Sequence, residues 1–363
     1  MALWKVIADR IKLFPHPNSD KLLVGKIGKF QVVVSKENGY RDGDVVVFAP
    51  ERSILPEEIC AEYVNTDTGV SYLHGNNHNR VGAVRLRGEL SEGVTLPYAW
   101  IMKTLYEVGV MGATGSVPLG IDISGPLGIR KYIPTIPTEL IGKVSYMNET
   151  EFGIRFVQHD VENFRTFVDE FTPGEMVSIT EKLNGSQVNI MVDPQGKVTL
   201  TSKYLGQDGF VIDADPDNKY WKAVHNSGLV ELPTWRRLTG HDVQIVAEMI
   251  PCAKGFTYGQ TEPTVRIFRV VFNGSEIPVA EVFEQDFFAS FRELWVPYMG
   301  TIAFDPEVFP LHAAGKEQVS GKSLHIREGI VITPKDGRQN SEHRLLAVKW
   351  LNPKYKASVE EIS

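Results

Sequence analysis

Residues 180–186 read Thr180-Glu181-Lys182-Leu183-Asn184-Gly185-Ser186, and the way this stretch folds decides the architecture of the second half of the chain. The apolar run MVSIT ends at Thr180, and the alternating run SQVNIMV begins at Ser186. One interpretation is a β-hairpin, because an Asn-Gly dipeptide between two apolar runs favours a tight turn and would leave the lysine exposed. The other interpretation is a lysine at the mouth of a cleft, where its amine could attack a nucleotide phosphate.

Length and composition place the chain among ordinary globular proteins. Its 363 residues favour two domains, and 42% hydrophobic with 23% charged residues allow a sizeable core. No apolar run approaches the length of a membrane span, and the N-terminus lacks the apolar segment of a secretory signal, so we expect no membrane association. Cys60 and Cys252 are too few for a disulfide scaffold or a four-thiolate zinc site. We therefore expect the cytoplasm or another reducing intracellular compartment.

The charge balance argues against a generally basic nucleic-acid-binding protein, because the net charge is −7. Residues 316–356 nevertheless contain nine Lys/Arg against four Asp/Glu. This local excess fits a cationic surface for phosphates, and it fits a solvated charged face equally well.

The first hundred residues contain short apolar runs broken by Gly, Asn, Asp and Pro, among them LLVGKIG, FQVVVS, DVVVFA, GAVRLRG and EGVTLP. Runs of this length and spacing predict a small antiparallel barrel or sandwich. Residues 112–138 are rich in Gly and Pro, and we place the domain junction at their end. The expected domains are residues 1–140 and 141–363.

The second domain is expected to mix helices and strands. The segment HDVENFRTFVDEF places Val161, Phe164, Phe167, Val168 and Phe171 at the spacing of a short helix. Strand-like runs follow, including EMVSIT, QVNIMVD, KVTLTS, VQIVAEMI, RIFRVVF, EGIVIT and LLAVKW, with helical stretches between some of them. The pattern predicts an α+β fold.

Six residues of this domain, at strand ends or on strand faces, have side chains suited to nucleotidyl transfer. They supply one amine nucleophile, two carboxylates, two further cations and one aromatic ring: Lys182 with Gly185, Lys203, Glu248, Phe268, Glu328 and Lys349. Lysine attacks the α-phosphate of ATP only as the free amine, and nearby cations and a bound metal disfavour its ammonium form. Carboxylates hold Mg²⁺ directly or through water, and an aromatic ring offers a stacking face for a base.

The ordered set EKLNGS, AEM, FRVVF, EGIVI and AVK resembles the covalent nucleotidyltransferase superfamily, which comprises ATP-dependent DNA and RNA ligases and mRNA-capping enzymes. The N-terminal half, with HPNSDKLLVGKIGKFQVVVSKENGYRDGDVVVFAPERSILPE, RVGAVRLRGELSEGVTLP and LGIRKYIPTIP, is similar to RNA ligases of the Deinococcus and Naegleria type. That resemblance implies an N-terminal OB-like β-barrel followed by an ATP-grasp-like ligase domain with antiparallel sheets and flanking helices.

The resemblance also implies roles for individual residues. Lys182 would carry the covalent AMP, Glu248 and Glu328 would act with it, and Lys349 would contact the α-phosphate. The other nucleotide-contacting positions would be Glu181, Gly185, Lys203, Phe268 and Ile330. Mg²⁺ or Mn²⁺ would be held, through water, by Asn184, Glu248 and Glu328. In the N-terminal domain, Arg80, Arg85 and Arg87 would contact nucleic acid, or would simply form a charged barrel exterior.

Three positions depart from the family pattern. Asn184 stands where many members have an aspartate, so a metal-water acceptor loses its charge. Leu351 stands where a second phosphate-contacting lysine is usual, and Lys354 replaces it only if the strand end bends back. Phe272 competes with Phe268 for the stacking role, because period-two alternation places both rings on one face.

The resemblance implies a monomeric ATP-dependent RNA ligase that joins an RNA 3′-hydroxyl to a 5′-phosphate in RNA or an RNA-containing nicked duplex. Two alternatives stay open. One is another covalent nucleotidyltransferase, either a DNA ligase or a capping guanylyltransferase. The other is a non-catalytic nucleic-acid-binding protein on a ligase scaffold.

Overall fold

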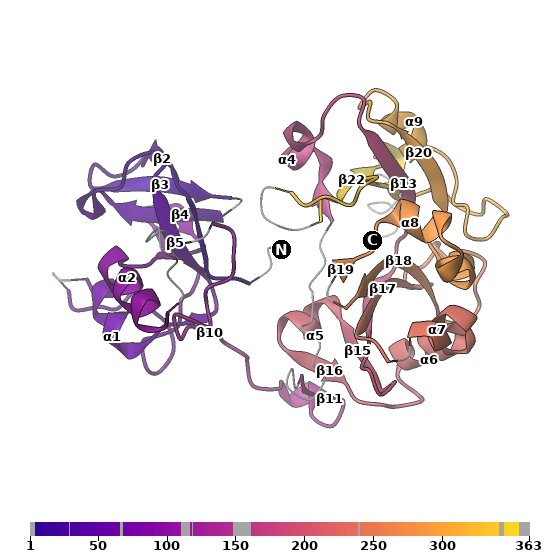
Figure 1. The fold of residues 1–363 in the computed structure, drawn as a ribbon, viewed down its shortest axis with the longest axis horizontal. Helices are drawn as coiled ribbons and strands as arrows, with labels where there is room; N and C mark the ends of the chain where they lie inside the picture. Colours follow the sequence, from indigo (N-terminus) through magenta and orange to yellow (C-terminus); the bar gives the residue numbers. More distant parts are fainter. Residues whose placement is uncertain are drawn as a thin grey trace. The chain divides into compact units, whose positions relative to one another are not determined.

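The short apolar runs of the N-terminal region form strands in the computed structural model, which describes residues 4–28, 30–65, 68–109, 117, 119–147, 161–238, 240–273, 275–340 and 345–355. These residues divide into two compact units at Pro134 and Thr135 (Figure 1). This division lies a few residues before the junction expected near residue 140. Every described helix is too short or too polar to reach across a bilayer.

The N-terminal unit consists of small antiparallel sheets. The strands are β1 (Ile7–Arg10), β5 (Val45–Pro50) and β9 (Gly93–Thr95) in one sheet, β2 (Lys12–Pro15), β3 (Leu22–Ile27) and β4 (Phe30–Ser35) in a second, and the pairs β6 (Ser53–Ile54) with β10 (Arg130–Lys131) and β7 (Val84–Leu86) with β8 (Glu89–Ser91). Among the described residues, backbone pairing does not join these strands into one closed barrel. The expected strands are therefore present, while the barrel takes the form of packed sheets.

Two apolar clusters hold this unit together. One contains Val32, Val46 and Phe48, so strands of both three-stranded sheets pack on each other. The other places Ile101 and Leu105 of α2 (Tyr98–Glu107) beside residues of β1 and β5, and the short helix α1 (Glu57–Cys60) contributes to it. β5 is buried at five consecutive positions, Val46–Pro50, so it contributes to both clusters.

The C-terminal unit contains two sheets. The seven-stranded antiparallel sheet has the order β11 (Val144–Tyr146), β16 (Phe210–Ile212), β15 (Val198–Ser202), β14 (Ser186–Val192), β17 (Val243–Ile250), β18 (Thr264–Phe272) and β19 (Ser275–Glu276). The five-stranded sheet has the order β12 (Glu162–Asn163), β22 (Val348–Leu351), β21 (Gly329–Pro334), β13 (Met176–Lys182) and β20 (Tyr298–Ala303), of which only the β12–β22 pair is parallel. With the helices, this is the α+β architecture expected.

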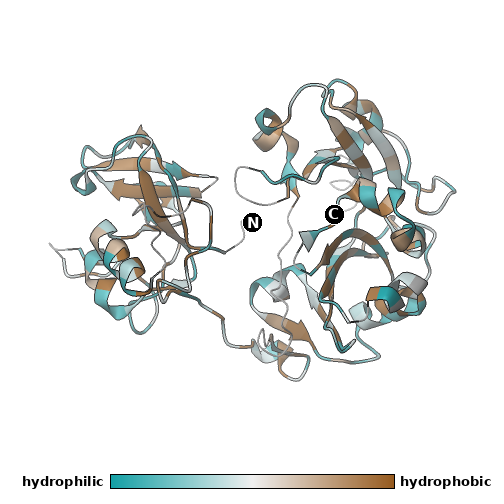
Figure 2. Ribbon diagram, viewed as in Figure 1, coloured by the Kyte–Doolittle hydropathy of each residue, from teal (hydrophilic) through white to brown (hydrophobic). Residues whose placement is uncertain are grey.

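Each of the two sheets has its own core. The larger sheet packs on α6 (Lys219–Asn226), α7 (Pro233–Leu238), α8 (Val279–Glu284) and the 3₁₀ helix Asp286–Leu294, and its central strands are strongly apolar (Figure 2). The smaller sheet packs on α4 (Phe164–Phe167) and α9 (Phe309–Ala313) through a cluster of phenylalanines. α5 (Lys203–Gln207) begins where β15 ends. The helix expected around residues 161–171 is shorter than its pattern, because β12 occupies its first residues; His159 and Asp160 lie outside the described residues.

The stretch 180–186 is not a hairpin. β13 pairs with β20 and β21, whereas β14 pairs with β15 and β17, so the two strands that flank Asn184-Gly185 belong to different sheets. The chain crosses between the sheets over three residues, and Leu183 is buried in the core of the larger one. Local turn propensity suggested a hairpin here, but each strand finds its partners far away along the chain.

We expect Ile245→Ala to lower the free energy of unfolding of the C-terminal unit by about 2–5 kcal/mol, because Ile245 is fully buried in the core of the larger sheet. The same substitution at Ile141, which is 67% exposed, is the matched control and should change stability by less than about 0.5 kcal/mol. Denaturant titration of both variants measures the difference; equal effects would contradict this description of the core.

Candidate active site

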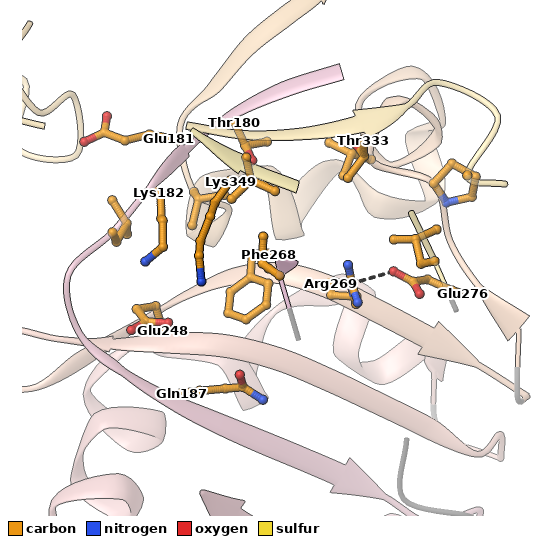
Figure 3. Close-up of a pocket in the computed structure, with 18 of the residues that line it drawn as sticks. Thr180, Glu181, Lys182, Gln187, Glu248, Phe268, Arg269, Glu276, Thr333 and Lys349 are labelled. Atoms are coloured by element: carbon orange, nitrogen blue, oxygen red, sulfur yellow. Dashed lines mark ion pairs between the residues drawn. The ribbon is translucent and has the colours of Figure 1, made fainter. Parts of the chain in front are cut away.

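A pocket lies between the two sheets of the C-terminal unit (Figure 3). Both sheets contribute polar and apolar side chains to its lining, which includes Thr180 and Lys182 from β13, Gln187 from β14, Glu248 from β17, Phe268 and Arg269 from β18, Glu276 from β19, Val331 and Thr333 from β21, and Lys349 from β22. Where β13 continues toward β14, Lys182 and Leu183 form part of the pocket lining, whereas Asn184 and Gly185 do not.

Lys182 is the last residue of β13, and its side chain points into the pocket (Figure 3). Its Nζ donates a hydrogen bond to Glu328 Oε1 at 2.7 Å, and the two side chains are 25% and 10% exposed. Glu328 directly precedes β21, the neighbour of β13. The pairing of these strands therefore places the amine beside a carboxylate that is 146 residues distant in the chain.

Two further cations face Lys182. Lys203 opens α5 and Lys349 lies on β22, and both line the pocket. Burial lowers the pKa of Lys349, and the charges of Lys182 and Lys203 lower it further. Three ammonium groups thus share one part of the pocket, an arrangement that favours binding of a polyanion.

Glu248 faces the same group of cations from β17. Burial raises the pKa of its carboxyl to about 7 and the charge of Glu328 adds to this, while Lys182 and Lys203 oppose it. Gly185 donates its backbone N–H to Glu248. A Cβ on Gly185 would lie 2.7 Å from Glu248 Cγ and would overlap the backbone oxygen of Met249. The glycine therefore allows the chain crossing to approach β17 closely.

Asn184 is engaged by two tyrosines. Its backbone N–H donates to Tyr258 Oη at 2.7 Å, and its side-chain Nδ2 donates to Tyr355 Oη. Sequence reasoning missed both tyrosines, because neither lies near Asn184 in the chain. Both nitrogen atoms of Asn184 thus fix the crossing, and its side-chain oxygen is left as the side-chain atom that could accept from a metal-bound water.

Phe268, and not Phe272, lines the pocket. Phe272 packs against His241 and Phe287 instead, with ring centroids 4.7 and 6.4 Å apart. The register between β17 and β18 shifts at Val246/Ala247, so Phe268 is the extra residue of a β-bulge. A bulge redirects side chains and breaks period-two alternation, which is why the two rings do not share a face.

Glu181 turns its carboxylate away from the other pocket residues (Figure 3). The carboxylate is 1% exposed, accepts a hydrogen bond from Gln318 N at 2.9 Å, and lies 3.6 Å from Arg327 Nε. Burial raises its pKa to about 7, although Arg327 and the Gln318 hydrogen bond oppose the shift. Any contact of Glu181 with a ligand in the pocket would come from its backbone.

Ile330 does not line the pocket. It is fully buried in the core of the smaller sheet with Ile332. Val331 and Thr333, one residue along in the alternation, face the pocket. The sequence predicted that Ile330 contacts the nucleotide, whereas its neighbour Val331 lines the pocket. Both faces of β21 are apolar, so the sequence alone does not show which face meets the core.

Arg269 and Glu276 line the pocket and were not expected there. They form an ion pair of 2.7 Å, with side chains 6% and 19% exposed (Figure 3). Alternation would turn Arg269 away from the face that holds Phe268, and the bulge brings both to it. A bulge has no reliable local signal, and β19, which carries Glu276, has only two residues.

Neither position 351 nor Lys354 supplies the pocket with a second lysine beside Lys349. Leu351 is two residues beyond Lys349 on β22, on the same face by alternation, and it has no charge. Lys354 is exposed and does not line the pocket. The described residues thus supply three lysines to the pocket: Lys182, Lys203 and Lys349.

The donor set fits a divalent metal that is bound mainly through a ligand and water. Among the described residues, no group of three or more His, Cys, Asp or Glu side chains could form a protein cage. Glu248 lines the pocket and interacts electrostatically with Glu328, which lies beside Lys182, and carboxylate oxygens suit Mg²⁺ and Mn²⁺. Mg²⁺ typically uses one or two carboxylates together with substrate phosphates, and these residues provide that number.

The three arginines of the N-terminal unit have different surroundings. Arg80 is half-buried, with its guanidinium 4.2 Å from the ring centroid of Tyr132. Arg85 and Arg87 are exposed on the β7–β8 hairpin, where Arg85 Nη1 donates to Gly88 O at 3.1 Å. A nucleic-acid contact by these residues stays a prediction.

Comparisons with known proteins give two family matches. The RNA ligase family model matches residues 175–351, and an OB-fold domain model matches residues 6–98. A sequence search of curated proteins gives no significant match.

Solved structures of Naegleria gruberi RNA ligase are similar to the chain at low identity. The complex with pyrophosphate has 17% identity and a TM-score of 0.48, covering 99% of this chain and 100% of that one. An arginine-to-alanine variant with ATP and manganese has 16% identity and a TM-score of 0.48, with the same coverage. A lysine-to-methionine variant with AMP and manganese has 18% identity and a TM-score of 0.47, covering 99% of each chain.

We expect the stability of the protein to fall as pH rises from about 4.5 to about 7, in part because of Glu181. Its pKa is about 7 in the folded state against 4.5 as the ordinary value, so the folded state binds more protons in this window. Glu181→Gln does not titrate. The stability of the wild type relative to this variant should therefore decrease by up to about 3 kcal/mol across the window. Denaturant titrations at several pH values test this, and parallel pH curves would contradict it.

Proposed function

We propose that the protein is an ATP-dependent RNA ligase, because the RNA ligase family model matches residues 175–351 and an OB-fold domain model matches residues 6–98. It would join an RNA 3′-hydroxyl to a 5′-phosphate, at nicks in RNA-containing duplexes, through a lysyl-AMP on Lys182. The observation that carries the proposal is the position of Lys182. Its amine lies in a pocket between two sheets, paired with Glu328 and facing Lys203, Lys349 and Glu248.

In the first step, Lys182 Nζ attacks the α-phosphorus of ATP, a phosphorus–nitrogen bond forms, and pyrophosphate leaves. The attack requires the free amine, and the Glu328 carboxylate lies within hydrogen-bonding distance of Lys182 Nζ, where it could accept the proton. Lys203 and Lys349 would stabilise the negative charge that spreads over the phosphate oxygens during the attack. The side chains of Lys203 and Lys349 line the same pocket as Lys182.

Phe268 provides a flat apolar face for the adenine, and Val331 of the opposite sheet also lines the pocket. A base between these side chains would be held by stacking on one side and apolar contact on the other. Glu248, on the neighbouring strand β17, would accept hydrogen bonds from the ribose or from metal-bound water.

A divalent metal, Mg²⁺ or Mn²⁺, would neutralise phosphate charge when bound. Glu328 and Glu248 would hold it, directly or through water, and the Asn184 side-chain oxygen would accept from one of its waters. Because Asn184 is uncharged and already donates to Tyr355, its contribution to metal affinity should be smaller than that of an aspartate.

The later steps transfer AMP to the 5′-phosphate of the RNA, after which the 3′-hydroxyl attacks that phosphate and AMP leaves. These steps reuse the same charged pocket, since each moves a phosphoryl group between oxygen or nitrogen atoms. The N-terminal OB-fold domain would bind the nucleic acid, a use of OB-folds that combines cations with aromatic rings.

A non-catalytic role is the second candidate, and it rests on two observations. Leu351 stands in place of a charged residue beside Lys349, and Asn184 replaces a carboxylate. Such a protein would bind RNA without forming a covalent nucleotide, so the adduct experiment below separates it from a ligase.

We expect the wild-type protein to gain the mass of one adenylyl group when incubated with ATP, a divalent metal and pyrophosphatase. Prior treatment with pyrophosphate removes AMP that is already bound. Lys182→Ala should show no adduct, because no other amine replaces the nucleophile. Lys197→Ala, at an exposed lysine near the turn between β14 and β15, is the matched control and should react like the wild type. Intact-mass spectrometry reads all three, and an adduct on Lys182→Ala would place the nucleophile elsewhere.

We expect nicked duplexes with a ribose at the 3′-hydroxyl end to be sealed at least about tenfold faster than matched duplexes with a deoxyribose there. The comparison changes a single hydroxyl, so it isolates recognition of the sugar. Faster sealing of the deoxyribose nick would assign the protein to DNA ligases, and an adduct with GTP in place of ATP would assign it to capping enzymes.

Phe268→Ala should weaken ATP binding by about 1–3 kcal/mol, or about 5- to 150-fold, because stacking of a base on an aromatic ring contributes that much. Phe268→Tyr keeps the ring and should bind ATP nearly as the wild type does. Phe272→Ala removes the same volume outside the pocket and is the matched control, with little effect on ATP affinity. Calorimetric titration with ATP measures all three, and a larger loss in Phe272→Ala than in Phe268→Ala would contradict the assignment.

A further inference from the structure

The Arg269–Glu276 ion pair lies in the pocket, and the proposed reaction does not explain its role. The distance from Arg269 Nε to Glu276 Oε1 is 2.7 Å, and both side chains line the pocket. In Figure 3, Phe268 lies between this pair and the amines of Lys182 and Lys349. The pair is therefore separated from the phosphate-binding end by the ring expected to stack on the base.

Burial of this pair needs a reason beyond stability. A buried ion pair often contributes little net stability, because taking two charges out of water offsets their mutual attraction. The β-bulge at Phe268 is what brings Arg269 to the pocket face, and bulges are over-represented next to active sites. Both observations point to a ligand-binding role for the pair.

We propose that Glu276 reads the exocyclic amino group at the six-position of adenine, and that Arg269 holds the carboxylate in place for this contact. The proposal rests on the proposed function, because it takes the pocket to bind the base of ATP. With the triphosphate near Lys182 and the base on Phe268, the edge of the base would face the Arg269–Glu276 pair. Glu276 would then be a specificity-determining residue of the nucleotide pocket.

The chemistry separates two purines that have the same size. Adenine presents an amino group at the six-position, which donates to a carboxylate. Hypoxanthine, the base of ITP, presents a carbonyl oxygen there, and two acceptors facing each other in a sheltered pocket repel. Burial raises the pKa of Glu276 to about 7 and Arg269 opposes the shift, so the carboxylate is ionised at about pH 8.

Substitution by glutamine should shift the binding preference from ATP toward ITP. Arg269 donates through its guanidinium, so in Glu276→Gln the new amide would turn its oxygen toward Arg269. Its NH₂ group would then face the base, where it can donate to the carbonyl of ITP but not accept from the amino group of ATP. The size of the side chain stays the same, so the change in preference reports hydrogen bonding and not shape.

The test is calorimetric titration of the full-length protein with ATP and with ITP at about pH 8, in chelator so that no covalent step occurs. We expect the wild type to bind ATP at least about tenfold more tightly than ITP. Glu276→Gln should lose that preference by at least about tenfold. The ratio of the two affinities does not depend on the fraction of folded protein. Glu284→Gln, which removes an exposed partner of Lys335 from α8, is the matched control and should keep the wild-type ratio.

If Glu276→Gln fails to fold, Arg269→Met combined with Glu276→Leu replaces the whole pair by apolar side chains, which proteins tolerate better than one unpaired buried charge. This double variant should bind ATP and ITP with similar affinity. Purine riboside triphosphate, which lacks the amino group, should bind the wild type at least about tenfold more weakly than ATP.

An unchanged ATP/ITP ratio in Glu276→Gln, or equal wild-type affinity for ATP and purine riboside triphosphate, would overturn the assignment of Glu276. Those results are compatible with an adenylyl adduct on Lys182, so the ligase proposal would stand. Conversely, the expected affinity ratios without any adenylyl adduct on Lys182 would support the role of Glu276 in recognising adenine and would contradict the ligase proposal.

Discussion

The pocket depends on the crossing of the chain from one sheet to the other at residues 182–185. β13, a strand of the smaller sheet, ends at Lys182, and β14, a strand of the larger sheet, begins at Ser186. Such a short link holds the two sheets close together along this line. Only a residue without a Cβ fits at position 185, because the backbone there packs directly on Glu248 and Met249. Lys182 is therefore held at the edge between the two sheets by the short covalent link and by its ion pair with Glu328.

Charged groups lie on both sides of β13, and only those on one side face the pocket. On the pocket side of β13, Lys182 faces Glu328 and the other lysines. On the opposite side, Glu181 meets Arg327 in a nearly dry environment. The second pair cannot touch a ligand, yet it ties the strand that carries Lys182 to the segment that carries Glu328. A buried ion pair of this kind is weak evidence for stability and better evidence for a defined position of the strand.

The bulge on β18 decides the composition of the pocket more than any single side chain does. Without it, Arg269 would face away from Phe268, and the pocket would lack its only arginine among the described lining residues. With it, an aromatic ring and an ion pair lie next to each other on one wall (Figure 3). One extra residue in a nine-residue strand thus adds a polar end to a pocket that is otherwise apolar around Phe268.

The sequence by itself determined the α+β class and most strand positions, and it identified Lys182, Lys203, Glu248 and Lys349, which line the pocket, because these depend on local periodicity and on ordered motifs. The tertiary structure decided which strands pair, and so whether residues 180–186 form a hairpin or a crossing. It also decided that Val331 rather than Ile330, and Phe268 rather than Phe272, line the pocket. Periodicity defines two faces of a strand, but the face that meets a ligand depends on partners far along the chain and on bulges that shift the register.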